Sequence, residues 1–202
     1  MLIDIVILPS DHIRSVVGRK IQAVAKDYPH LYIVDNIKLT PHSSLFHLRV
    51  LKTNLKKLEQ EVEIIVKRYK PVPLKSIGFV KYDKGPVLHF RISKPTIISK
   101  LNVEITEKCR KFRKGELFPW YKNYPFSKLD KSYIKKYGSY WSVGKNFDPH
   151  LTMVKYKVPA DGPKMIKKMG RFGFKFLADT VAVCEINKNG QVVKILKKFK
   201  LK

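Results

Sequence analysis

Two stretches of the sequence decide its fold, Thr40-Pro41-His42-Ser43-Ser44-Leu45 and Asp148-Pro149-His150-Leu151-Thr152-Met153. Both read proline, histidine, any residue, serine or threonine, then an apolar residue, and each opens an apolar run typical of a β-strand. Side chains alternate between the two faces of a strand, so the histidine and the hydroxyl of each stretch should share a face. The stretches are separated by about half the chain, which indicates two related lobes that face one another across a cleft.

An imidazole beside a hydroxyl, present twice, suits acid–base chemistry at a phosphate group. One histidine can deprotonate an attacking water while the other protonates the leaving oxygen, because imidazoles exchange protons near neutral pH. The hydroxyls can donate to the non-bridging phosphate oxygens and hold the phosphorus in line. A single His-x-Ser stretch usually marks only a polar strand edge, but two matched copies favour a catalytic pair. This chemistry needs no cofactor and no metal, and the sequence lacks the spaced carboxylates or Cys/His clusters typical of metal sites.

The two stretches resemble the signature of the 2H phosphoesterases, which include LigT-like proteins, 2′-5′ RNA ligase-like proteins and RNA 2′,3′-cyclic phosphodiesterases. That signature is two His-x-Thr/Ser motifs, the second typically Phe-x-Pro-His-x-Thr, which residues 147–152 match closely. The resemblance implies a two-lobed α+β fold, with two antiparallel sheets facing a central cleft and helices on the outside. It also implies a catalytic pair and three phosphate-binding side chains: His42 and His150, then Ser44, Thr152 and Lys155. Ser44 replaces the commoner threonine, which the family tolerates.

The activity that this resemblance implies is a metal-independent phosphodiesterase acting on RNA or nucleotide 2′,3′-cyclic phosphate ends. Two alternatives stay open. One is hydrolysis of 2′-5′-linked or cyclic oligonucleotides, and the other is a catalytically silent RNA-binding module on the same scaffold. The matched histidines argue against the silent module, because binding alone does not require two imidazoles.

Hydrophobic periodicity around the motifs predicts a single domain over residues 1–202, in which short helices alternate with β-hairpins. Strands are expected at about 2–8, 31–38, 43–51, 76–82, 87–93, 147–156, 174–186 and 191–199. Helices are expected at about 11–27, 55–69, 95–112 and 163–169. Ser10 or Asp11 should cap the first helix, Asn54 the second, and Gly115 should end the third. Residues 83–86 and 187–190 are typical hairpin turns.

Residues 113–146 interrupt this pattern and are expected to form an insertion with one short helix. The segment is crowded with Phe, Tyr and Trp side chains between lysines, among them Trp120 and Tyr124. Most of these rings are interpreted as the small core of the insertion, although a base-stacking platform is the alternative. Tyr140 and Trp141 are nearest the second motif, so they are the best candidates to stack on a base.

The other histidines carry weaker expectations. His47 lies five residues after His42, so a regular strand would turn it to the opposite face. His89 and Arg91 share a strand face that either lines the cleft or is an ordinary polar sheet face, and the second interpretation is favoured. His12 and His30 lie near the ends of elements and are expected to be exposed.

The composition is strongly basic, with 42 Lys and Arg against 16 Asp and Glu in 202 residues, a net charge of +26. The excess is spread over both halves, so it belongs to the folded surface and favours a polyanionic partner, RNA or a nucleotide first. A lysine-rich surface that merely stays solvated is the alternative. The same choice applies to residues 188–202, which hold six lysines and no acid. Hydrophobic residues make up 44% of the chain, which excludes a disordered tail protein.

Cysteine usage and the first residues predict a protein of the cytoplasm, and a monomer is expected. Cys109 and Cys184 lie in apolar or helical contexts, as expected for buried thiols in a reducing compartment. Residues 1–10 lack a basic start, and Asp4 interrupts their apolar run, so they are interpreted as a core strand instead of a signal peptide. No apolar run is long enough to span a membrane.

Overall fold

The computed structural model describes residues 1–81, 85–114, 118, 121 and 126–202. The strands are β1 (Leu2–Ile7), β2 (His30–Ile33), β3 (Ser43–Arg49), β4 (Val72–Lys81), β5 (Val87–Ile92), β6 (His150–Tyr156), β7 (Lys175–Ala178), β8 (Thr180–Ile186) and β9 (Val192–Lys200). The helices are α1 (Asp11–Ala25), α2 (Leu55–Val66), α3 (Thr96–Cys109), α4 (Lys128–Tyr137) and α5 (Asp161–Met169). The predicted elements are present in the expected order, with ends that differ by a few residues.

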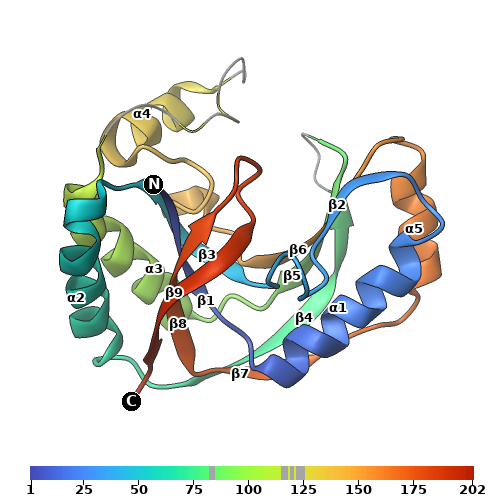
Figure 1. The fold of residues 1–202 in the computed structure, drawn as a ribbon, viewed down its shortest axis with the longest axis horizontal. Helices are drawn as coiled ribbons and strands as arrows, with labels where there is room; N and C mark the ends of the chain where they lie inside the picture. Colours follow the sequence, from blue (N-terminus) through green and yellow to red (C-terminus); the bar gives the residue numbers. More distant parts are fainter. Residues whose placement is uncertain (82–84, 115–117, 119–120, 122–125) are drawn as a thin grey trace.

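The strands form two antiparallel sheets, which confirms the predicted two-lobed α+β fold. The four-stranded sheet has the order β3-β1-β8-β9, and the five-stranded sheet has the order β2-β6-β5-β4-β7. Helices α1 and α5 pack against the five-stranded sheet, while α2 and α3 pack against β9 and β3 of the other. Figure 1 shows these helix pairs on opposite outer sides of the molecule, with the sheets between them. Each motif strand belongs to a different sheet, β3 to one and β6 to the other.

The single strand predicted at 174–186 is wrong, because the chain changes sheets at Asp179. Strand β7 pairs with β4 in the five-stranded sheet, whereas β8 pairs with β1 and β9 in the four-stranded sheet. The Asp179 carboxylate accepts hydrogen bonds from Thr180 Oγ1 and Lys200 Nζ, each at 2.7 Å, and these bonds hold the crossover. Burial alternates along β7 and is almost continuous along β8, a change that the apolar pattern alone does not distinguish from one long strand.

The predicted helix caps are confirmed in part. Ser10 caps α1 as expected, its Oγ accepting from the amide of Ile13 at 3.4 Å. Asn54 does precede α2, but its side chain makes no cap hydrogen bond, because a short 3₁₀ turn already leads the chain into that helix. Gly115, the expected end of the third helix, lies outside the described residues, as do Asp83 and Lys84 of the first predicted turn.

The insertion forms a second, smaller hydrophobic cluster. Helix α4 begins with a capping box, in which Ser127 and Asp130 exchange hydrogen bonds, and it ends at Gly138, whose φ of 75° is left-handed. Four aromatic side chains from the segments on either side of α4 pack together over β1 and β8: Phe118, Tyr121, Phe126 and Tyr140. This packing confirms that these rings are mainly core. Trp120 and Tyr124 lie outside the described residues.

The sequence also predicted how far the two cysteines and two of the histidines, His12 and His30, are buried. Cys109 and Cys184 are buried free thiols, and burial raises the pKa of Cys109 to about 12, so that thiol stays protonated. His12 is exposed as expected, but His30 is only partly exposed because its Nδ1 bonds to the carbonyl of Tyr28 at 2.9 Å. Among the helices of the described residues, none has both the length and the apolar character needed to cross a bilayer.

Candidate active site

A cleft of about 190 Å³ brings the two motifs together. Its walls come from both sheets, from the end of the insertion and from the β8–β9 turn: Tyr32, His42, Ser44, His47, Val87, His89, Trp141, Ser142, His150, Thr152, Lys155, Asn189, Gly190 and Gln191. Every catalytic and phosphate-binding residue implied by the sequence therefore lines one cavity. Of the two stacking candidates, Trp141 lines it. Tyr140 is 3% exposed and contacts Trp141, and it lines a neighbouring hollow instead.

The two motif histidines are held in the same way. In each, Nδ1 lies 2.7 Å from the carbonyl oxygen of the residue two positions earlier, Thr40 for His42 and Asp148 for His150. The proline between carbonyl and histidine fixes one backbone dihedral of that short loop and so aims the carbonyl at the ring. Since Nδ1–H donates to the carbonyl, Nε2 is left as the atom that can gain or lose a proton.

A β-bulge follows the hydroxyl of the first motif. Along the β1–β3 pair, Ile5 is opposite Phe46 while Val6 is opposite Ser44, so Leu45 is an extra residue. Such an insertion shifts the alternation of side chains by one position. The side chain three residues after the hydroxyl, that of His47, therefore returns to the cleft.

The second motif has a bulge at the equivalent place. Along the β5–β6 pair, Leu88 is opposite Val154 while His89 is opposite Thr152, which leaves Met153 as the extra residue. Lys155 is thereby returned to the cleft in the same manner. The two strands thus present matching triplets of histidine, hydroxyl and basic residue.

The expectation for His47 was wrong for this reason. A regular strand would turn His47 away from His42, but the bulge at Leu45 places both in the same cavity. A bulge of this kind leaves no clear mark in a run of alternating and apolar residues. The second motif did contain a signal for the position of His47. There Lys155 follows Thr152 by three residues, the same spacing by which His47 follows Ser44.

Asp4 lies behind the first motif and was missed by the sequence argument, which noted it only as an interruption of an apolar run. It is fully buried on β1, and its Oδ2 accepts a 2.6 Å hydrogen bond from Ser44 Oγ. The same oxygen is 3.1 Å from His47 Nε2 and 3.6 Å from His42 Nε2. A buried carboxylate is costly without such partners, so a lone acid inside a core strand was itself a signal of function.

His89 occupies the corresponding region behind the second motif, so the favoured interpretation of it as an ordinary polar face was wrong. Its Nδ1 is 3.4 Å from Thr152 Oγ1, and its ring centre is 4.2 Å from that of His150. Burial lowers the pKa of His89 well below its usual value, and the neighbouring His150 lowers it further, so His89 is neutral at pH 7. Arg91 is half exposed and pairs with Asp148, their Nη2 and Oδ2 atoms 3.1 Å apart.

Burial also sets the charge of the catalytic candidates. It lowers the pKa of both His42 and His150, because the enclosed cleft disfavours the charged ring. Asp4 opposes this effect for His42, and the carbonyl and carboxylate of Asp148 oppose it for His150. Burial thus favours the neutral form of both rings, and of the two only His42 has a carboxylate within 4 Å of its Nε2 among the described residues.

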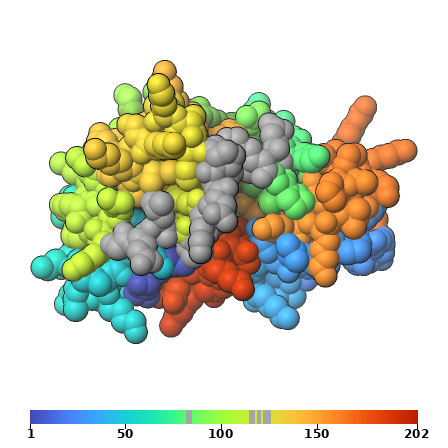
Figure 2. Space-filling model, turned by 90° about the horizontal axis from the view of Figure 1, so that it is seen from above, coloured from blue at the N-terminus to red at the C-terminus, as the bar shows by residue number. Residues whose placement is uncertain are grey.

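The β8–β9 turn closes one side of the cleft against the other lobe. Gln191 and Tyr32 of β2 both line the cleft, and burial raises the pKa of the Tyr32 phenol to about 12. The amide of Thr40 donates to the carbonyl of Val192 at 3.0 Å, which ties this turn to the loop before His42. Figure 2 shows the tip of this hairpin between the insertion and the β2 segment. The sequence predicted the turn but not its place in the site.

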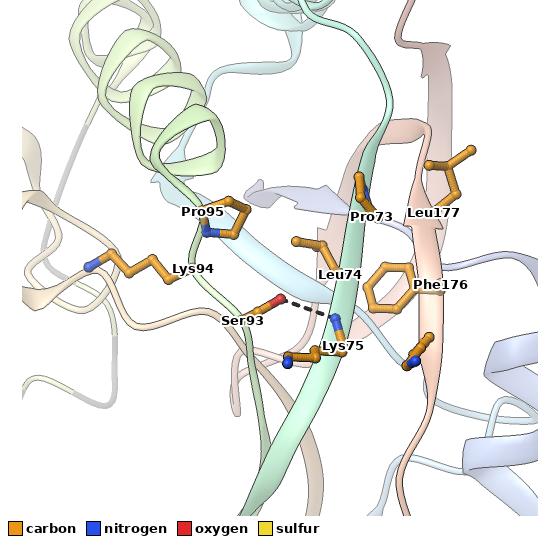
Figure 3. Close-up of a pocket in the computed structure, with 9 residues that line it drawn as sticks. Pro73, Leu74, Lys75, Ser93, Lys94, Pro95, Phe176 and Leu177 are labelled. Carbon is orange, nitrogen blue, oxygen red and sulfur yellow. Dashed lines mark hydrogen bonds between the residues drawn. The ribbon is translucent and has the colours of Figure 1, made fainter.

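A hollow with a larger volume than the cleft lies in another part of the molecule. A more open depression of about 650 Å³ lies where β4, β7 and the start of α3 meet (Figure 3). Prolines, lysines and apolar side chains line it, with Ser93 Oγ accepting from the amide of Lys75 at 3.0 Å. It has no histidine or carboxylate in its lining, so nothing there could exchange a proton at neutral pH.

No protein-family model matches the chain, and no curated protein matches it. Solved structures, however, match it over its whole length. The TT0787 protein of Thermus thermophilus is 16% identical with a TM-score of 0.67, covering 100% of this chain and 98% of that one. E. coli LigT complexed with 3′-AMP is 11% identical with a TM-score of 0.56, covering 100% and 97%.

A further structure, described as a phosphoesterase, is also 11% identical, with a TM-score of 0.57 over 100% of this chain and 98% of that one. At these identities the likeness concerns the backbone arrangement. It extends over both sheets and all five helices of the described residues. The chain therefore has the same two-lobed α+β fold as TT0787 and E. coli LigT.

Proposed function

We propose that this protein is a metal-independent phosphodiesterase that opens 2′,3′-cyclic phosphate ends of RNA or of nucleotides. The observation that carries the proposal is the matched pair of histidines in one cleft, each with Nδ1 bonded to a carbonyl and Nε2 available. Solved structures of E. coli LigT, which shares the fold, contain 3′-AMP, NADP⁺ and ATP, and these ligands support a nucleotide substrate.

His150 acts as the general base and His42 as the general acid in this proposal. His150 Nε2 takes a proton from water as the water oxygen bonds to phosphorus. The P–O bond to one ribose oxygen breaks, and His42 Nε2 gives its proton to that oxygen, leaving a phosphomonoester and a free hydroxyl. Asp4, 3.6 Å from His42 Nε2, favours the protonated form of His42, which is the reason for this order.

Lys155 and Thr152 hold the phosphate in this scheme. Lys155 lines the cleft and forms no ion pair with the described residues, so its charge is available to a phosphate oxygen. Thr152 lies next to the neutral ring of His89, and its hydroxyl can rotate to donate to the substrate. Ser44 differs, because its single proton is donated to Asp4 and its oxygen is left as an acceptor.

A second candidate is hydrolysis of 2′-5′-linked or cyclic oligonucleotides, and a neighbouring hollow of about 400 Å³ favours it. That hollow shares His89, Trp141 and His150 with the cleft, so the catalytic ring lies between two cavities. A cyclic phosphate end has a nucleoside on one side of phosphorus only. An internucleotide linkage has one on each side and would occupy both cavities.

The test is turnover of matched substrates by the intact chain in the presence of EDTA. A 2′,3′-cyclic mononucleotide, a 2′-5′ dinucleotide and a 3′-5′ dinucleotide should be compared, with His42→Ala and His150→Ala as controls. We expect the cyclic phosphate to be opened and both variants to be inactive. Hydrolysis of the 2′-5′ dinucleotide alone would select the second candidate, and tight binding of all three without turnover would mean a silent RNA-binding module.

A further inference from the structure

His47 and Lys155 occupy the same position in their two motifs. Each follows the hydroxyl by three residues, each is returned to the cleft by a bulge, and each lines the cavity. Lys155 places a permanent positive charge there. The first motif places an imidazole there instead, which is charged only when it carries a second proton.

Two oxygen atoms lie near the outer ring nitrogen of His47. Its Nε2 is 3.1 Å from Oδ2 of the fully buried Asp4 and 3.4 Å from Ser44 Oγ. Among the described residues, no Lys or Arg lies within ion-pair distance of Asp4, so histidine protons are what can balance this buried carboxylate. His47 is the closer of the two histidines and is 12% exposed, so it remains accessible from the cleft.

Two uncharged side chains also lie near this pair. Cys184 faces Asp4 across the β1–β8 pair, and burial raises the pKa of its thiol, so it stays neutral. Phe118 meets the His47 ring edge-on, with ring centres 6.0 Å apart. A positive charge on His47 lowers the pKa of both His42 and His150, so its field reaches both catalytic rings.

We propose that His47 is a phosphate-contacting residue, whose imidazolium, held by Asp4, supplies from the first sheet the cation that Lys155 supplies from the second. A tetrahedral anion in the cleft would thus meet one cation from each lobe. The identity of that anion as a phosphodiester rests on the proposed function.

Titration with sulfate at constant ionic strength tests this contact, because sulfate is a tetrahedral dianion whose charge does not change between pH 6 and pH 8. We expect His47→Gln and Lys155→Gln each to weaken sulfate binding about tenfold at pH 6, the usual effect of one charge-assisted contact. His47→Lys should bind within about threefold of the wild type at pH 6. His12→Gln, an exposed change on α1, should bind as the wild type does.

The pH dependence separates a contact from a structural role. Wild-type affinity should fall between pH 6 and pH 8, whereas that of His47→Lys should fall much less, because a lysine keeps its charge over this range. Equal affinities of the wild type and His47→Gln, with Lys155→Gln weakened, would overturn the inference. If His47→Gln does not fold, a His47→Lys variant whose affinity falls as steeply as that of the wild type would also overturn it.

Turnover measured in parallel keeps this inference separate from the proposed function. A wild type that opens a cyclic phosphate while His47→Gln keeps the same KM and kcat would overturn the role of His47 alone. A wild type that binds no sulfate and turns over none of the substrates would overturn the proposed function and this inference together. A raised KM in His47→Gln that His47→Lys restores is the result expected.

Discussion

The first and second motifs share their geometry and differ in what lies behind them. In both, Nδ1 of the histidine bonds to the carbonyl oxygen of the residue before the proline, and a bulge follows the residue with the hydroxyl. Across the strand, however, His47 is opposite a buried carboxylate, Asp4, whereas Lys155 is opposite Val87. The two motifs therefore share their backbone geometry, while the neighbouring strands place different side chains beside them.

This difference assigns separate tasks to the halves. In the first half, the buried Asp4 carboxylate contacts two imidazoles and one hydroxyl. The second half holds a fixed charge, because Lys155 has no carboxylate beside it among the described residues and His89 stays neutral. Each prediction below changes one half and leaves the other as its reference.

Loss of either motif histidine should have the largest effect. We expect His42→Ala and His150→Ala each to lower kcat about 100-fold or more, because each removes a positioned acid or base. Steady-state kinetics on the preferred substrate measures this effect, with thermal melting to check the fold. If one variant kept near-normal kcat while folded, only the other half would be catalytic.

Replacement of Asp4 should have an intermediate effect. We expect Asp4→Asn to lower kcat about tenfold and to move the optimum to lower pH, because without the carboxylate His42 holds its proton only at lower pH. The matched change in the second half is Asp148→Asn. That carboxylate is half exposed and paired with Arg91, so its loss should change kcat less than threefold. Equal effects of the two changes would remove the distinction between the halves.

Salt should distinguish long from short substrates. The net charge of +26 includes exposed lysines along β9, of which Lys197 pairs with Glu63 and Lys200 with Asp179. For an oligonucleotide with a cyclic phosphate end, kcat/KM should fall by about 0.7 log units per tenfold salt for each additional phosphate contact. A mononucleotide with the same end should show a shallower slope. Parallel shallow slopes would mean that the positive surface is only solvated and that the substrate is a small nucleotide.

Stability should fall as the solution becomes acidic. Burial lowers the pKa of His89 in the folded protein below its value in the unfolded chain, so its contribution is present above about pH 6.5 and is lost as the pH falls. We expect the Tm to fall by a few degrees between pH 7 and pH 5. In His89→Gln this slope should be smaller, since one of the groups that takes up a proton on unfolding is gone. An unchanged slope would mean that the charge of His89 is not set by burial.

Removal of divalent metals should have the smallest effect. We expect EDTA to leave kcat and KM unchanged, because the two histidines supply both proton transfers. Among the described residues, no group of three or more His, Cys, Asp or Glu is arranged to hold a metal ion. Loss of activity on chelation that one divalent ion restores would contradict the two-histidine mechanism. Dialysed enzyme assayed with and without added Mg²⁺ provides the measurement.

The sequence predicted the structural features that produce a periodic pattern or a motif. The fold class, the strand that follows His42, the strand that carries His150 and the helix start at Ser10 all follow from local signals. The positions of His47 and His89 in the cleft did not. The bulge at Leu45 shifts the alternation of side chains without changing the apolar character of the strand, and the sequence does not show which face of the strand with His89 lines the cleft. The split at Asp179 was missed for a related reason, since a change of sheet keeps the chain extended.

The crossover at Asp179 also determines how the molecule can be divided. It returns the end of the chain to the first sheet, where β8 lies between β1 and β9. A cut before residue 147 would therefore leave one fragment with β1 and β3 but without β8, and another with β6 but without β5. Neither fragment would contain a complete lobe, although each would keep a complete motif. The lobes should consequently unfold in one cooperative transition, and activity should return only when both fragments are present together.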